Sequence, residues 1–189
     1  MAAVPRSTAF RWNRLILVNG QRAYSSDVEQ DLIPVHENYP NILLEREAAQ
    51  ALARIMEQID GWRFIAPVSG WRSLEEQLTI YTDSLRENGP EFTAKFVAMP
   101  GHSEHQTGLA IDLGLRQPEI DFIRSAFPYE GICQKFRELA PAYGFIERYP
   151  ADKEHITGIA HEPWHFRYVN TPHSEIMAFK GLTLEEYLA

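Results

Sequence analysis

The sequence predicts an α+β fold in a single domain, with a small central antiparallel sheet flanked by helices. Segments with helical periodicity and short β-favouring runs follow one another without the regular strand–helix–strand alternation that builds a parallel sheet. The length of 189 residues and the hydrophobic content of 44% suit one domain with a sizeable core. No internal repeat, low-complexity segment or linker divides the sequence.

The first forty residues (1–40) are expected to form an N-terminal extension that packs on a main domain of residues 41–189. An apolar run at 15–18 favours a strand, and the Asn-Gly pair that follows is a strong hairpin-turn signal. Residues 21–24 would then return as the second strand. The remainder of the extension, with its prolines, reads as a loop.

The next part of the chain predicts a helix, a strand and two more helices. Apolar residues recur at three- and four-residue steps over 43–59, which is typical of an amphipathic helix. A strand follows at 64–68, and Pro67 favours an edge position. The Ser-Leu-Glu-Glu sequence that opens residues 73–89 matches a capping box. Another helix is expected at 90–97, with proline at its first position.

The C-terminal half predicts shorter elements. We expect a loop at 121–129 and a helix at 132–143. Short strand candidates and two final helices complete the prediction, with strands at 144–146, 158–160 and 164–169 and helices at 172–179 and 183–188.

Composition excludes several classes of function. Lys and Arg number 18 against 26 Asp and Glu, and the net charge of −8 argues against nucleic acid as a partner. The single cysteine, Cys133, cannot form an internal disulfide, which fits a reducing compartment. Neither a signal-peptide core nor an apolar membrane span occurs in the sequence. We therefore expect a cytoplasmic protein without membrane insertion.

A short run rich in metal-binding side chains contains His105 and Asp112. The aspartate lies within a β-favouring apolar run, where an unpaired carboxylate would be costly. The odd spacing of the two residues would place them on opposite faces of a regular strand, so they converge only if the chain bends at Gly108. Two ligands do not complete a catalytic zinc site, and a surface histidine with a capping aspartate remains an alternative.

The sequence His161-Glu-Pro-Trp-His165 matches the H-E-x-x-H string of helical metalloproteases. That motif requires both histidines on one face of a helix, and Pro163 inside it costs a helix about 3 kcal/mol. The residues that follow favour a strand, so we reject the helical interpretation. Instead, His165 alone would bind the metal and Glu162 would be the general base, with His161 a bystander or an outer group.

Two motifs carry a resemblance to a known family. The pattern S-x-H-x-x-G-x-A-x-D runs from Ser103 to Asp112, and E-x-W-H runs from Glu162 to His165. With further similarities over about residues 60–188, the chain resembles the zinc D-Ala-D-Ala peptidases of the VanX/VanY type. The resemblance is greatest to the bifunctional VanXY kind, which combines D,D-dipeptidase and D,D-carboxypeptidase activities in glycopeptide resistance.

The resemblance implies one zinc ion per chain, with His105, Asp112 and His165 as its ligands. It also implies Glu162 as catalytic base and Arg72 as a group that stabilises the transition state. Gln77 and Ser103 would bind the substrate. From the residues alone, a surface ion pair with a neighbouring glutamate is the alternative for Arg72, and the capping of backbone amides is the alternative for Gln77 and Ser103.

The expected function is therefore hydrolysis of the D-Ala-D-Ala dipeptide, removal of the terminal D-Ala of the peptidoglycan precursor pentapeptide, or both. The expected partner is a small D-Ala-terminated peptide. One alternative is an L,D-carboxypeptidase or endopeptidase that acts on cell-wall peptides. Another is a non-catalytic, zinc-containing cell-wall-binding module, which a fourth protein ligand such as His102 or His161 would favour.

Overall fold

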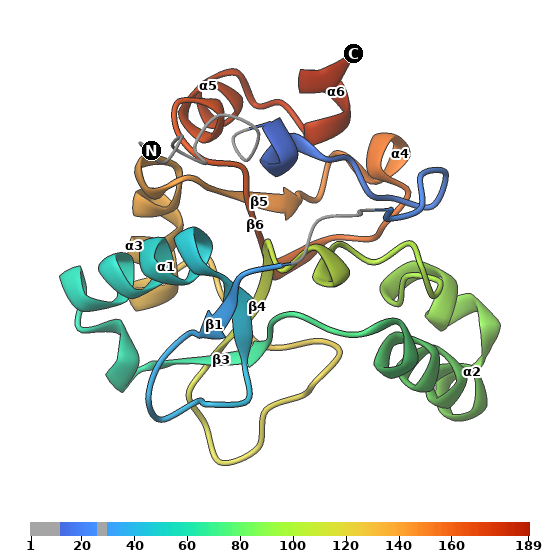
Figure 1. Cartoon of the computed structure of the whole chain (residues 1–189). Coiled ribbons are helices and arrows are strands. Elements are labelled where there is room, and N and C mark those ends of the chain that lie inside the picture. The colour runs from blue at the N-terminus through green and yellow to red at the C-terminus, as the bar shows by residue number, and fades with distance from the viewer. Residues whose placement is uncertain (1–11, 26–29) are drawn as a thin grey trace, which may run out of the picture.

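The computed structural model describes residues 12–25 and 30–189 and shows the predicted α+β fold (Figure 1). Its centre is a four-stranded antiparallel sheet of order β3-β4-β6-β5. These strands are β3 (Ile65–Ser69), β4 (Ala110–Leu115), β6 (Glu162–Tyr168) and β5 (Phe145–Tyr149). A second, two-stranded sheet pairs β1 (Leu32–Pro34) with β2 (Leu43–Glu45).

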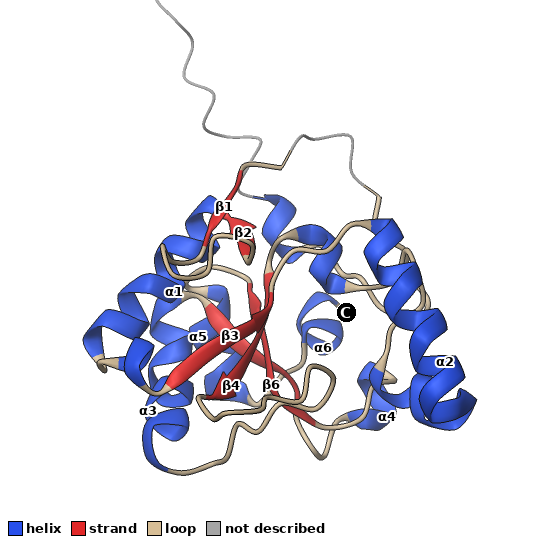
Figure 2. Cartoon of the chain, turned by 90° about the horizontal axis from the view of Figure 1, so that it is seen from below, coloured by secondary structure: helices blue, strands red, loops and turns tan. Residues whose placement is uncertain are grey.

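Helices cover the sheet from several sides. Helices α1 and α3 lie together on one side of the molecule and α2 stands on the other (Figures 1 and 2). The helices are α1 (Arg46–Gln58), α2 (Leu74–Phe96), α3 (Gly131–Leu139), α4 (Glu154–Thr157), α5 (His173–Lys180) and α6 (Leu184–Leu188). The described residues also form four 3-10 helices, η1 (Trp12–Leu15), η2 (Gly61–Arg63), η3 (Glu104–Thr107) and η4 (Ala140–Tyr143). None of the helices within residues 12–25 and 30–189 combines the length and the hydropathy of a membrane span.

The core follows the two-residue period of the central strands. Ile111 and Leu113 of β4 are fully buried in the main apolar cluster, together with Phe166 of β6. Side chains alternate between the faces of a strand, so Asp112 and His165 point away from this core. The strand pattern therefore presents polar side chains on the sheet face that is not filled by the core.

Residues 16–18 are irregular in the structure, so the strand predicted at 15–18 is wrong. The turn predicted after it is present, because Asn19 and Arg22 form an isolated antiparallel bridge. The guanidinium of Arg167 donates to the backbone carbonyls of Arg14 and Ile16, which occupies carbonyls that a strand would use. Residues 1–11 of the predicted extension lie outside the described residues.

The helix predicted from residue 43 begins three residues later, at Arg46. Residues 43–45 instead form β2, which pairs with residues 32–34 in a region predicted to be loop. The Glu45 carboxylate caps the helix by accepting from the backbone N–H groups of Glu47 and Ala48. This contact ends the strand and starts the helix.

The boundaries of α2 agree with the prediction. Ser73 and Glu76 form the capping box, and the helix is broken at Gly89, where φ is 82°. Pro67 lies in β3, which is an edge strand as expected. The strand predicted at 158–160 is wrong, because α4 ends there in a left-handed glycine.

Candidate metal centre

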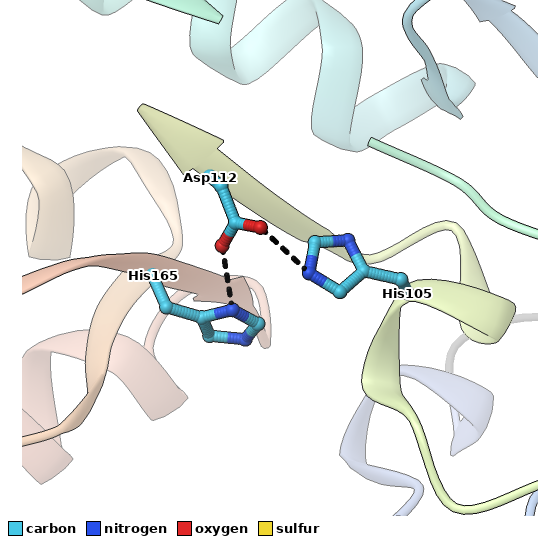
Figure 3. Close-up of side chains that lie close together, drawn as sticks. All are labelled: His105, Asp112 and His165. Atoms are coloured by element: carbon cyan, nitrogen blue, oxygen red, sulfur yellow. Dashed lines mark hydrogen bonds and ion pairs between the residues drawn. The ribbon is translucent and has the colours of Figure 1, made fainter. Parts of the chain in front are cut away.

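The structure brings three predicted ligands together from three elements (Figure 3). His105 lies on η3, Asp112 on β4 and His165 on β6, and all three are buried. Asp112 lies between the two imidazoles, with Oδ2 3.1 Å from His105 Nε2 and Oδ1 2.8 Å from His165 Nδ1. One ligand atom from each residue lies within 4.8 Å of the others. This spacing is suited to three ligands of a single ion.

Strand register and one glycine create this convergence. Asp112 and His165 are direct cross-strand partners, so their side chains leave the same face of the sheet. His105 reaches them because Gly108 turns the chain with φ 71° between η3 and β4. The positive φ favours glycine here, and a Cβ atom on Gly108 would also require Leu32 Cδ2, at 2.8 Å, to move.

The remaining imidazole nitrogens have partners that orient the rings. His105 Nδ1 lies 2.6 Å from the Gly70 carbonyl oxygen, and His165 Nε2 lies 3.5 Å from Glu104 Oε2. If these nitrogens carry the protons, the lone pairs of His105 Nε2 and His165 Nδ1 face Asp112. Metal-binding histidines are commonly held in this way by an acceptor behind the ring.

The charges of the cluster fit a divalent cation. Burial and the Arg72 charge lower the pKa of His105 to about 4, which keeps this imidazole neutral. Burial also lowers the pKa of His165, but Asp112 and Glu104 outweigh it and raise the pKa to about 9, so a bound metal would displace a proton from this ring. Burial raises the pKa of Asp112, but the two histidines outweigh it and keep the carboxyl ionised. Two imidazole nitrogens and one carboxylate are a donor set of catalytic zinc sites, which leave one position open.

Glu162 lies at the start of β6, beside His165. Its Oε2 atom is 3.9 Å from His165 Nδ1. The odd spacing of these residues predicts opposite faces, but the pairing with β5 shifts register here, with Glu147 opposite Phe166 and Tyr149 opposite Glu162. Burial has the largest effect on the pKa of the Glu162 carboxyl group and raises it. The His165 charge lowers this pKa, and the net result is a raised pKa of about 8. The site therefore holds a carboxyl group whose pKa suits proton transfer near neutral pH.

Arg72 follows the end of β3 and points into the same site. Its Nη2 atom lies 3.9 Å from Asp112 Oδ2, and the side chain is 15% exposed. Within the described residues, Arg72 forms its ion pair with Asp112 and not with Glu75 or Glu76, so the surface-pair alternative is not the observed one. Its Nε atom is buried and has no hydrogen-bond partner among residues 12–25 and 30–189. The site thus contains a buried cation with an unused donor.

Gln77 and Ser103 line the same cavity, which has a volume of about 50 Å³. Gln77 Nε2 donates to the Ala98 carbonyl oxygen at 2.8 Å, while its Oε1 atom is buried and accepts no hydrogen bond from the described part of the chain. All seven predicted site residues line this cavity. Its apolar walls are formed by Ile80, Phe96, Val97, Phe122, Ile123, Ile159 and Trp164. The seven polar site residues and these apolar side chains therefore line the same cavity.

The other histidines stay outside the cluster. His161 is half-buried and bonds Tyr129 Oη at 2.7 Å, and His102 Nδ1 bonds the Asn19 carbonyl oxygen at 2.8 Å. Because residues 162–168 form β6, the H-E-x-x-H string does not lie on a helix, as the sequence predicts. Among the described residues, neither His102 nor His161 joins the three ligands.

Sequence reasoning missed the buried ion pairs behind His165. Glu104 accepts from Arg148 and Arg167, and both arginine side chains are fully buried. These arginines lie in strand-like runs with aromatic and aliphatic neighbours, where a buried cation requires a partner. That signal points to a buried acid but does not identify Glu104.

Comparison with known proteins identifies the family of this chain. The family model described as VanY, D-alanyl-D-alanine carboxypeptidase, matches residues 41–171. The chain is 41% identical over 187 residues to the bifunctional D-Ala-D-Ala dipeptidase and D-Ala-D-Ala carboxypeptidase VanXYC of Enterococcus gallinarum. That alignment covers 93% of this chain and 93% of the relative.

Two solved structures share the fold. The vancomycin resistance D,D-dipeptidase VanXYg, in complex with a D-Ala-D-Ala phosphinate analogue, superposes with a TM-score of 0.91 at 56% identity, covering 93% of this chain and 70% of that one. A mutant of the D,D-pentapeptidase VanY from a VanB-type resistance cassette, in complex with Zn(II), gives a TM-score of 0.76 at 29% identity and covers 94% and 99%. The resemblance drawn from the sequence motifs is confirmed. Because the family model spans most of the chain and VanXYC is similar over nearly its full length, this chain belongs to the VanY D-alanyl-D-alanine carboxypeptidase family.

Proposed function

We propose that this chain is a zinc-dependent D,D-peptidase that hydrolyses the D-Ala-D-Ala dipeptide and removes the terminal D-Ala of peptidoglycan precursor pentapeptides. The observation that carries the proposal is the buried cluster of His105, Asp112 and His165, with Glu162 and Arg72 beside it in one cavity. One zinc ion per chain would be held by the three clustered residues. The activities of the relatives supply the substrate class.

In the proposed mechanism, Glu162 is the general base. A zinc ion held by His105, Asp112 and His165 would supply a Lewis acid for the scissile carbonyl and for the attacking water. Glu162 takes the proton of the attacking water and delivers it to the amine of the departing D-Ala. Burial raises the pKa of Glu162, which favours the protonated carboxyl group that holds the proton between the two steps.

Arg72, Gln77 and Ser103 are proposed to position the substrate. The Arg72 guanidinium is fixed at the cavity and would donate to the oxyanion that develops on the scissile carbonyl. Arg72 Nε and Gln77 Oε1 are buried polar atoms without a partner in the part of the chain that the structure describes, and a bound peptide can satisfy them. Ser103 lines the same cavity as Gln77 and would bind the peptide's polar groups.

Space beside the cavity supports activity on longer peptides. A second cavity of about 640 Å³ adjoins the first and shares four residues with it, Val97, Ala98, Tyr149 and Ile159. Since a pentapeptide requires more room than a dipeptide, this space supports the dual specificity that we propose.

We also propose that residues 41–189 form the catalytic unit and that the described part of residues 1–40 is an extension docked on it, through ion pairs such as Arg14–Glu45.

The decisive experiment measures D-Ala release by the zinc-loaded protein from the dipeptide and the pentapeptide. Glu162→Gln should lower the rate by about 100- to 10,000-fold while zinc content stays at one per chain. Glu147→Gln is the matched control, because Glu147 pairs with Arg137 outside the cavity, and this variant should keep its activity. Wild-type rates in the Glu162 variant would refute the base assignment.

The same assay separates the alternative functions. Release of D-Ala only from a tetrapeptide with an L,D bond would identify an L,D-carboxypeptidase. Cleavage inside cross-linked peptides would identify an endopeptidase. Zinc binding without hydrolysis of any of these substrates would identify a non-catalytic binding module.

A further inference from the structure

Glu104 lies directly behind His165, one of the three clustered residues, and is one of the most buried charged groups of the structure. Its side chain is 1% exposed. Its two carboxylate oxygens have different partners. Oε1 accepts from Arg148 Nε and from Arg167 Nη1, both at 2.8 Å, whereas Oε2 faces His165 Nε2 at 3.5 Å. The arginines therefore leave one oxygen directed at the imidazole.

The charges around Glu104 balance without a contribution from His165. Arg148 extends to α6, where Nη1 and Nη2 donate to the two oxygens of Glu185 at 2.8 and 2.7 Å. Arg167 donates its other bonds to backbone carbonyl oxygens of residues 14, 16 and 168. Two carboxylates and two guanidiniums thus form a neutral cluster, in which Glu104 stays an acceptor.

From this geometry we propose that Glu104 is a positioning residue for the metal centre, which holds the proton of His165 on Nε2 and so directs the Nδ1 lone pair toward the metal. Arg148 and Arg167 fix the Glu104 carboxylate in the orientation that this requires. The inference rests on the proposed function only in assuming that zinc binds at this site. It assigns a role to a residue other than the three ligands, the base and the substrate-binding groups.

The competing interpretation is that the cluster only ties η3, β5, β6 and α6 together. A purely structural role requires the arginine bonds to Oε1 but no contact between Oε2 and His165. The two roles therefore differ in their consequences for metal binding, and variants of residues within the same cluster can separate them.

The first test compares the zinc affinities of Glu104→Gln and Glu185→Gln, measured by competition with a chromophoric chelator. In Glu104→Gln the amide oxygen would remain with the arginines, and the NH₂ group would face His165 Nε2. That donor favours the imidazole tautomer with its proton on Nδ1, the nitrogen that the metal requires. Zinc affinity should fall by about 10- to 100-fold.

Glu185→Gln is the matched control. It also removes a carboxylate from Arg148, but Glu185 has no contact with His165 among the described residues. Its zinc affinity should stay at the wild-type value even if the metal-free protein melts at a lower temperature. Equal losses of zinc affinity in the two variants would overturn the positioning role in favour of the structural one.

A second measurement covers the case in which Glu104→Gln does not fold. In Cd²⁺-substituted wild-type protein with ¹⁵N-labelled histidine, ¹¹³Cd–¹⁵N coupling should appear at Nδ1 of His165, and its Nε2 proton should exchange slowly with solvent. In Glu104→Asp, which keeps the charge but shortens the side chain, that proton should exchange faster and zinc should bind more weakly. Metal coupling at Nε2 of His165, or an unchanged proton and zinc affinity in Glu104→Asp, would overturn the inference.

The outcome does not depend on which peptide the protein cleaves. If wild-type protein binds zinc but releases no D-Ala, the proposed function fails while the test of Glu104 stands. If wild-type protein binds no zinc, the metal centre and the role of Glu104 are both refuted.

Discussion

At the scale of single residues, two glutamates of the site differ in pKa because their surroundings differ. Glu104 and Glu162 are both buried glutamates beside His165. Burial raises the pKa of each, but Arg148 and Arg167 reverse the effect at Glu104 and hold its pKa well below the usual range. Within the described residues no pair of arginines bonds to Glu162, and burial raises its pKa to about 8. One carboxyl is therefore suited to orienting a ligand and the other to transferring a proton.

Arg72→Lys should separate transition-state stabilisation from metal binding. Lysine keeps the positive charge but loses the planar set of donors that fits an oxyanion. We expect kcat for D-Ala-D-Ala to fall by about 100-fold, with zinc content unchanged. Steady-state kinetics and metal analysis check this.

Arg116→Lys is the control for this substitution. Arg116 follows the far end of β4 and donates to Tyr39 Oη and to the Trp62 carbonyl oxygen, away from the cavity. A loss of zinc in Arg72→Lys would mean that Arg72 supports Asp112 rather than the reaction.

At the scale of secondary-structure elements, local sequence signals predict starts and ends well but miss pairings between distant segments. The capping box at Ser73 and the break at Gly89 are where the sequence predicts them, because each depends on a few adjacent residues. The periodicity at 43–45 predicts a helix, yet these residues form a strand because their partner lies at 32–34. The three residues fit the helical period equally well, and only the pairing selects the strand.

Gly108→Ala should damage both stability and metal binding. A left-handed conformation costs an alanine about 1–2 kcal/mol, and the added Cβ would also meet Leu32. Displacement of the η3–β4 connection would move His105 away from Asp112. We expect a lower melting temperature and weaker zinc binding, measured by thermal denaturation and chelator competition.

Gly89→Ala provides the comparison for backbone strain alone. Gly89 also has a positive φ, of 82°, but a Cβ atom added there would have no other atom within 4 Å. This variant should lose stability without losing zinc affinity. Equal zinc affinities in the two variants would show that Gly108 does not place the ligand.

At the scale of the whole molecule, buried ion pairs connect the metal centre to both ends of the described chain. Glu104 reaches α6 through Arg148 and Glu185, and Asn19 Nδ2 also donates to Glu185 at 3.2 Å. Leu15 and Leu17 pack against the apolar cluster formed with α5 and α6. The N-terminal segment and the last helix therefore close over the sheet edge behind His165.

This connection predicts a loss of stability in acid. Burial raises the pKa of Glu185, but the hydrogen bonds and charge of Arg148 outweigh it, and the pKa lies below its ordinary value of 4.5. A carboxyl group with a lowered folded-state pKa contributes stability above its unfolded-state pKa, and that contribution disappears as pH falls through the folded-state value. The melting temperature should therefore fall below about pH 4.5.

The Glu185→Gln variant checks the assignment. It should be less stable than the wild type at neutral pH, and the difference in melting temperature should shrink as the pH falls below 4.5. A difference that stays constant with pH would mean that the ionised Glu185–Arg148 pair is not its source.

The sequence by itself determined the α+β class, the types of the three candidate ligands, the rejection of a helical zinc motif at Pro163 and the position of Arg72 after a strand. Each depends on residues that are close in the chain or on the chemistry of a single side chain. The motif resemblance grouped the three candidate ligands, whereas the tertiary structure alone decided the strand register that joins two of them and the partners of Glu104. Asp112 and His165 are 53 positions apart, and Glu104 lies 44 and 63 positions from its two arginines. Strand register and buried charge pairing create these contacts, and no local pattern encodes either.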